Sequence, residues 1–201
     1  MDQPKGNRRQ VQKAETRAVI LESARHFFAT KEYDKVTIRA VAAHAGIGLG
    51  TIYKHFPNKL SMLAAAFFDD LKFIYQDAID TVPDNVSFKQ QFVHISKRYF
   101  SFYTSHSTLS RAYLSRLFFY ERESLDQINA YDDAYANKIT ELIQAAQDRG
   151  EISKEKDSQV LALSVMSNYF FVLANFFLRD HQADPDQLAG MLEMLIDQTL
   201  Y

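Results

Sequence analysis

The chain has no glycine between Gly50 and Gly150, an interval that covers about half of its 201 residues. Glycine marks most tight turns and hairpins, so a stretch this long without it favours helices over short strands. No segment alternates polar and apolar residues for long enough to indicate a strand. Helical patterns start or stop at the four prolines, Pro4, Pro57, Pro83 and Pro185. The sequence therefore predicts an all-α fold.

Apolar residues recur at helical spacing along most of the chain, which predicts about nine helices. Thr37 is the expected N-cap of a short second helix, and Gly46 is expected to end it in the left-handed conformation. Asn58 is the expected N-cap of a long fourth helix that stops before Pro83. The other helices are expected at about 15–30, 49–56, 87–104, 107–121, 124–149, 155–180 and 185–200.

Charge divides the chain into two parts. Residues 1–62 carry 11 Lys and Arg against 5 Asp and Glu, a net charge of +6. Residues 63–201 carry 12 against 20, a net charge of −8. The basic part, residues 1–62, is therefore expected to bind a polyanion, although clustering of charges on a solvated face would give the same numbers. The acidic part, residues 63–201, is called the acidic body below. We predict two domains, 1–62 and 63–201.

Residues 37–59 read TIRAVAAHAGIGLGTIYKHFPNK. Two short helices around a glycine-containing turn, each with an apolar side, are typical of a helix-turn-helix, whose second helix enters the major groove of DNA. Gly48 and Gly50 carry no side chains, so the backbone there can approach a phosphate or a base closely. Ile47, Ile52 and Phe56 are interpreted as the core of the motif.

Side chains that can donate hydrogen bonds to DNA follow the glycines. Thr51 offers a hydroxyl and a methyl group, and Tyr53, Lys54 and His55 offer donors to phosphates, of which Lys54 can also reach a base. Tyr53 alone could equally be a surface aromatic packed on the first helix. The predicted DNA-binding residues are Thr37, Arg39, Gly48, Leu49, Gly50, Thr51, Tyr53, Lys54, His55 and Lys59.

The string AGIGLGTIYKHFPNK resembles the DNA-binding signature of the TetR (tetracycline-repressor) family of bacterial transcriptional regulators. The resemblance is dense from about Ile20 to Leu71. It implies a homodimeric, ligand-responsive regulator, with repression of a palindromic operator as the expected activity. It also implies roles for single residues. Backbone contacts would come from Thr37, Thr51, Tyr53, His55 and Lys59, and base contacts from Leu49, Thr51 and Lys54.

The basic arm before the first expected helix consists of Lys5, Arg8, Arg9 and Lys13. It admits two interpretations, because it either follows the DNA or is a disordered, solubilising tail.

The first 13 residues lack an apolar segment of the secretory kind, so we expect a cytoplasmic protein.

The run 160–178 contains no formal charge and is long enough to span a membrane. However, it contains two serines and two asparagines, and the chain has no tryptophan to mark a membrane interface. We therefore predict that it pairs with the last helix to form a homodimer through a four-helix bundle, without a membrane.

The acidic body contains 22 of the 27 Phe and Tyr residues. Most must be core, but rings with polar tips can also line an apolar ligand cavity. The family resemblance implies an inducer pocket between the fourth and eighth helices, for a small apolar or aromatic ligand. The candidate lining residues are Tyr99, Phe102, Tyr103, Phe118 and Tyr169.

Enzyme signatures are missing from the sequence. It has no cysteine, no GxSxG, no HExxH and no P-loop, and no two of its six histidines are spaced i, i+4. We expect no catalysis, no cofactor and no metal. The remaining alternative is a helical carrier or sensor of apolar ligands that has no DNA-binding role.

Overall fold

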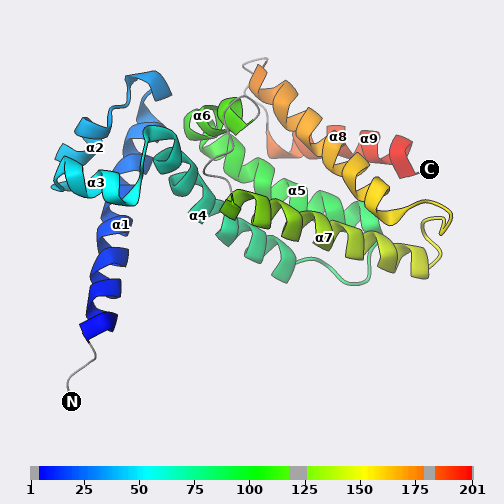
Figure 1. The fold of residues 1–201 in the computed structure, drawn as a ribbon. Coiled ribbons are helices and arrows are strands. Elements are labelled where there is room, and N and C mark those ends of the chain that lie inside the picture. Colours follow the sequence, from blue (N-terminus) through cyan, green and yellow to red (C-terminus); the bar gives the residue numbers. More distant parts are fainter. Residues whose placement is uncertain (1–4, 118–125, 179–183, 201) are drawn as a thin grey trace. The chain divides into compact units, whose positions relative to one another are not determined.

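The structure is a computed structural model, and it describes residues 5–117, 126–178 and 184–200. Within these ranges all regular structure is helical, which confirms the predicted all-α class. Figure 1 shows the elements. They are α1 (Lys5–Thr30), the short 3-10 helix η1 (Tyr33–Lys35), α2 (Ile38–Ala45), α3 (Leu49–His55), α4 (Lys59–Asp80), α5 (Phe88–Ser105), α6 (Ser107–Leu117), α7 (Asp126–Asp148), α8 (Ser158–Leu178) and α9 (Pro185–Leu200).

These helices form two compact units. The first consists of residues 1–70 and 106–121 and holds α1, α2, α3, the first half of α4, and α6. The second consists of residues 71–105 and 122–201 and holds the rest of α4 with α5, α7, α8 and α9. The division into domains 1–62 and 63–201 stays a prediction.

The ends of the short helices follow the predicted capping signals. The Thr37 hydroxyl accepts a hydrogen bond from the Ala40 amide at 3.1 Å and so caps α2. Gly46 ends α2 with φ of 66°, in the left-handed region. The Asn58 side chain accepts a hydrogen bond from the Ser61 amide at 2.7 Å, at the start of α4. Local sequence therefore sets the geometry of the helix-turn-helix.

The core of the first unit is built from helices that are distant in sequence. Phe28 of α1, Ile52 of α3 and Phe67 of α4 are all fully buried. The Phe67 ring stacks on Tyr113 of α6, with ring centroids 4.1 Å apart. Helix α6 also packs along α1. Ile52 joins α3 to this core, and α2 packs on both α1 and α3.

Four helices of the second unit close into a bundle. Helix α5 packs on α7 and α9, and α8 packs on the same two helices. Two ion pairs join α5 to α9, of which Lys89 to Asp197 spans 2.8 Å and the other links Lys97 to Asp186. These pairs are partly exposed, so most of the stability comes from the buried apolar side chains.

By length and composition alone, the segment Ser158–Phe177 of helix α8 is long and apolar enough to cross a membrane. Half of that window is buried inside the structure. Core helices pass the same test, so the length and composition of α8 are weak evidence for a span.

Candidate functional site

Helix α3 separates its buried residues from its exposed ones. Ile52 is fully buried and Phe56, directly after the helix, is nearly so. On the other side Lys54 is exposed, and half of the Tyr53 surface is accessible, at 50%. Thr51 is half-buried between these faces. A phenol, a hydroxyl and an ammonium group therefore lie together on the outer part of α3, as a polyanion would require.

The glycines before and within α3 are not required by the protein itself. Gly48 has φ of −62°, and Gly50 lies inside the helix. A Cβ atom placed on either would meet nothing within 4 Å. Glycine also weakens a helix relative to alanine. The fold gives no reason for glycine at these two exposed positions, and we predict that an outside molecule approaches the backbone closely there.

We therefore expect Gly50→Ala to separate stability from binding. The variant should raise the free energy of unfolding by about 0.5 kcal/mol or more, since alanine is the better helix former. Its affinity for duplex DNA should fall about tenfold, because the methyl group holds the backbone away from the groove. Chemical denaturation and fluorescence anisotropy measure the two effects. Unchanged DNA affinity in a stabilised Gly50→Ala variant would contradict this interpretation.

Gly46→Ala is the matched comparison for Gly50→Ala. A Cβ on Gly46 would also meet nothing within 4 Å, but the φ of this residue is positive. We expect this second variant to lose about 1 kcal/mol of stability, since alanine is strained there.

Two arginines of α1 bind the middle of α4, at residues that belong to the first unit. Arg17 pairs with Asp69 at 3.3 Å, and its guanidinium lies over the Phe56 ring at 5.5 Å from the centroid. Arg25 pairs with Asp70 at 3.2 Å and donates from Nε to the Ala66 carbonyl at 3.2 Å. Burial nevertheless raises the pKa of Asp70, against the effect of Arg25. Sequence reasoning missed these contacts because they join residues 39 or more positions apart.

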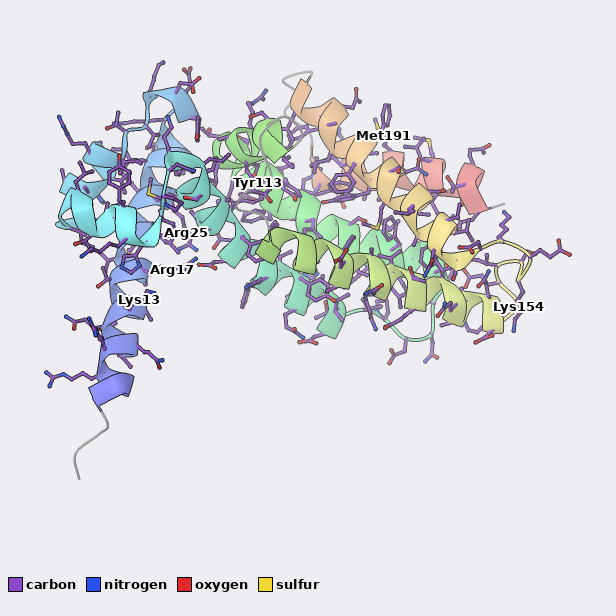
Figure 2. All side chains as sticks on the ribbon, in the orientation of Figure 1. Lys13, Arg17, Arg25, Tyr113, Lys154 and Met191 are labelled. Atoms are coloured by element: carbon purple, nitrogen blue, oxygen red, sulfur yellow. The ribbon has the colours of Figure 1, made fainter. Side chains whose placement is uncertain are left out.

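The amino-terminal part of α1 adds positive charge beside α3. The predicted basic arm is helical from Lys5 onward, and residues 8–15 are exposed. Figure 2 shows Lys13, Arg17 and Arg25 in order along α1. Burial, and then the charges of Lys13 and Arg17, lower the pKa of His55. His55 therefore lies in a positive potential, which attracts phosphate.

The remaining predicted contact residues have mixed surroundings. Arg39 and Leu49 are exposed, and the exposed Thr37 hydroxyl accepts the hydrogen bond that caps α2. Lys59 is turned inward, since its ammonium group donates to the carbonyls of Tyr33 and Val36 at 2.8 and 3.0 Å. It holds the loop between α1 and α2, so it positions the helix-turn-helix.

Several aromatic residues predicted to bind ligand meet inside the second unit. Tyr99 and Tyr103 of α5 and Tyr169 of α8 are buried, whereas Phe102 is half-buried. The rings of Tyr99 and Tyr169 are 6.3 Å apart, in an edge contact. Tyr135 of α7 lies against Tyr99 at 5.7 Å and was missed by the sequence analysis. Phe118 lies outside the described residues.

The chain combines a capped helix-turn-helix, whose second helix exposes polar and basic side chains, with a helical bundle that follows it. This combination defines a DNA-binding regulator. Two family profiles match the chain. Residues 20–66 match the profile of "Bacterial regulatory proteins, tetR family". Residues 85–172 match that of "Tetracyclin repressor-like, C-terminal domain".

The chain belongs to the TetR family, and it is a ligand-responsive, DNA-binding transcriptional regulator. Among curated proteins it is similar to the fatty acid metabolism regulator protein of Bacillus subtilis (strain 168). The two are 20% identical over 178 residues, which cover 88% of this chain and 92% of the relative.

Two solved structures share the fold. The regulator FadR from Bacillus subtilis in complex with stearoyl-CoA has a TM-score of 0.77 and 18% identity, over 92% of this chain and 99% of the other. FadR from Bacillus halodurans has a TM-score of 0.70 and 19% identity, over 100% of this chain and 96% of the other. At these identities the structural likeness establishes the fold.

Proposed function

We propose that this protein is a cytoplasmic repressor that binds a palindromic operator as a homodimer and leaves it when a long-chain fatty acyl-CoA binds. The exposed face of α3 carries the DNA-binding part, because its glycines are explained by close approach of an outside molecule. Two copies of α3 would enter successive major grooves about 34 Å apart. Contacts to the sugar-phosphate backbone of the DNA come from Thr37, Thr51, Tyr53 and His55. Contacts to the bases come from Leu49, Thr51 and Lys54.

The dimer forms through α8 and α9. These helices pack together and leave a row of large apolar side chains exposed, namely Val160, Leu163, Phe171 and Met194. Val160, Leu163 and Phe171 are spaced i, i+3 and i+11, so they share one face of α8. A soluble protein rarely leaves such a face uncovered, and a second copy would cover it as a four-helix bundle.

The ligand binds among the aromatic residues of the second unit. Tyr99, Phe102, Tyr103 and Tyr169 supply rings with a few hydroxyls, which suits a long apolar chain that carries a small polar group. The curated relative from Bacillus subtilis is named for fatty acid metabolism, and the similar FadR structure from the same species holds stearoyl-CoA. We also assign Phe118 to this site.

Ligand binding can release DNA only by stabilising a dimer with a different separation of the recognition helices. Helix α4 contributes residues to both units, so we assign the coupling to it.

The proposal is tested by release of DNA on addition of ligand. A duplex selected from random DNA by the purified protein is followed by fluorescence anisotropy while stearoyl-CoA is added. We expect the apparent Kd for the duplex to rise about tenfold or more at saturating stearoyl-CoA, within the usual range of allosteric coupling. Free coenzyme A is the control and should leave the Kd unchanged.

Two outcomes would refute the proposed function. An unaltered Kd at saturating stearoyl-CoA would exclude this ligand class. A flat dependence of binding on salt would exclude a phosphate-contacting interface and favour a carrier of apolar ligands.

A further inference from the structure

Four tyrosines of the second unit bring their hydroxyl groups together inside the bundle. This tyrosine cluster consists of Tyr99 and Tyr103 on α5, Tyr135 on α7 and Tyr169 on α8, and all four side chains are buried. Tyr169 shares a hydrogen bond with Tyr103. Burial, and then the neighbouring hydroxyls of Tyr103, Tyr135 and Tyr99, raise the pKa of Tyr169 well above its ordinary value. The hydroxyl of Tyr169 thus remains a proton donor at physiological pH.

Ser96 places a fifth hydroxyl on the face of α5 that carries Tyr99 and Tyr103. Ser96 precedes Tyr99 by three residues and Tyr103 by seven, so the three share one helix face. The Tyr169 ring contacts both Tyr99 and Phe100 at the next turn of that face, at centroid distances of 6.3 and 5.2 Å. Ser96 is fully buried, and its Oγ has no hydrogen-bond partner in the described part of the chain. A buried hydroxyl left in this state is costly, so the position calls for an acceptor or donor from outside the chain.

The chemistry of that outside group follows from the charges. No charged side chain is buried among the residues that the structure describes. The basic residues Lys89, Lys97 and Arg98 of α5 reach outward instead, to acidic partners on α9 and α4. A carboxylate buried beside the tyrosine cluster would lack a counter-ion and would pay a large desolvation penalty. A neutral oxygen acceptor has no such penalty and is matched by several O–H donors.

Given the proposed acyl-CoA ligand, on which this step rests, we propose that Ser96 and the tyrosine cluster form the subsite for the thioester carbonyl oxygen. The hydroxyls of Ser96 and Tyr103 donate to that oxygen. The Tyr169 hydroxyl donates to the Tyr103 oxygen and so orients the Tyr103 proton, while the surrounding rings contact the adjoining methylene groups. The subsite makes the protein selective for the esterified acid, because it recognises an uncharged carbonyl and, within residues 5–117, 126–178 and 184–200, buries no cation for a free carboxylate.

Calorimetric titration of the full-length wild-type protein with two ligands tests the subsite. One is stearoyl-CoA, and the other is S-octadecyl-CoA, the thioether in which a methylene group replaces the carbonyl. We expect stearoyl-CoA to bind about fivefold to tenfold more tightly, as the loss of a hydrogen-bonded acceptor predicts. In the double variant Ser96→Ala with Tyr169→Phe, the ratio of the two Kd values should fall below about twofold.

Tyr113→Phe is the matched control, since Tyr113 is a buried tyrosine of the first unit. It should keep the wild-type ratio. If the wild-type protein binds both ligands with equal Kd values, the proposed carbonyl subsite is refuted while the proposed function stands. This comparison needs no variant. A ratio that survives in the double variant would also overturn the subsite. Failure of both ligands to bind would overturn the proposed ligand class and this inference together.

Discussion

Replacing Tyr53 and Lys54 together by alanine is expected to reduce operator affinity roughly 1,000-fold. The proposed dimer brings two copies of each residue to the DNA, and four contacts at about 1 kcal/mol each give this factor. Both side chains are exposed on α3, while the core residue Ile52 between Thr51 and Tyr53 is left untouched. The free energy of unfolding should therefore change little.

Anisotropy titrations at several salt concentrations measure this effect. Loss of the Lys54 phosphate or base contact should also make the dependence of log K on log salt less steep. Lys35→Ala is the control, because Lys35 is an exposed lysine of the same unit whose ammonium pairs with Glu32 at 3.0 Å. Wild-type affinity in the double alanine variant, with the dimer intact, would place the DNA-binding surface elsewhere.

The helix ends could be predicted because their causes are local. Thr37, Gly46 and Asn58 each act within four residues of their own position, through a cap or a left-handed backbone. The same holds for the buried side of α3, where spacing alone separates Ile52 and Phe56 from their exposed neighbours. The helix-turn-helix could therefore be predicted from the sequence.

Contacts between distant segments could not be predicted in this way. Nothing around Arg25 indicates that it pairs with Asp70, since the two are 45 residues apart. Lys59 was assigned to DNA by its place in the motif, yet its ammonium binds the loop before α2. In the bundle, the excess of aromatic residues and the family resemblance indicated Tyr99 and Tyr103 as candidate ligand-lining residues. Tyr135 joins them only because α7 packs on α5.

Phe171→Glu is expected to convert the proposed dimer to monomers. Phe171 lies on the uncovered face of α8 with 60% of its surface exposed, so the fold of one protomer does not depend on it. A two-fold dimer buries this residue twice, and losing an interfacial aromatic anchor costs about 2 kcal/mol in each copy. The dimer Kd should rise roughly 1,000-fold, and the two glutamates would repel each other in addition.

Phe73→Glu separates a specific interface from a general effect of charge. Phe73 is more exposed than Phe171, at 77%, but it belongs to α4 and lies outside the α8 and α9 face. Sedimentation velocity should show a monomer for Phe171→Glu and a dimer for Phe73→Glu, with similar circular dichroism for both. Because one recognition helix reads only half of a palindrome, the Phe171→Glu variant should also lose operator binding although α3 is unchanged. A dimeric Phe171→Glu protein would move the interface away from α8.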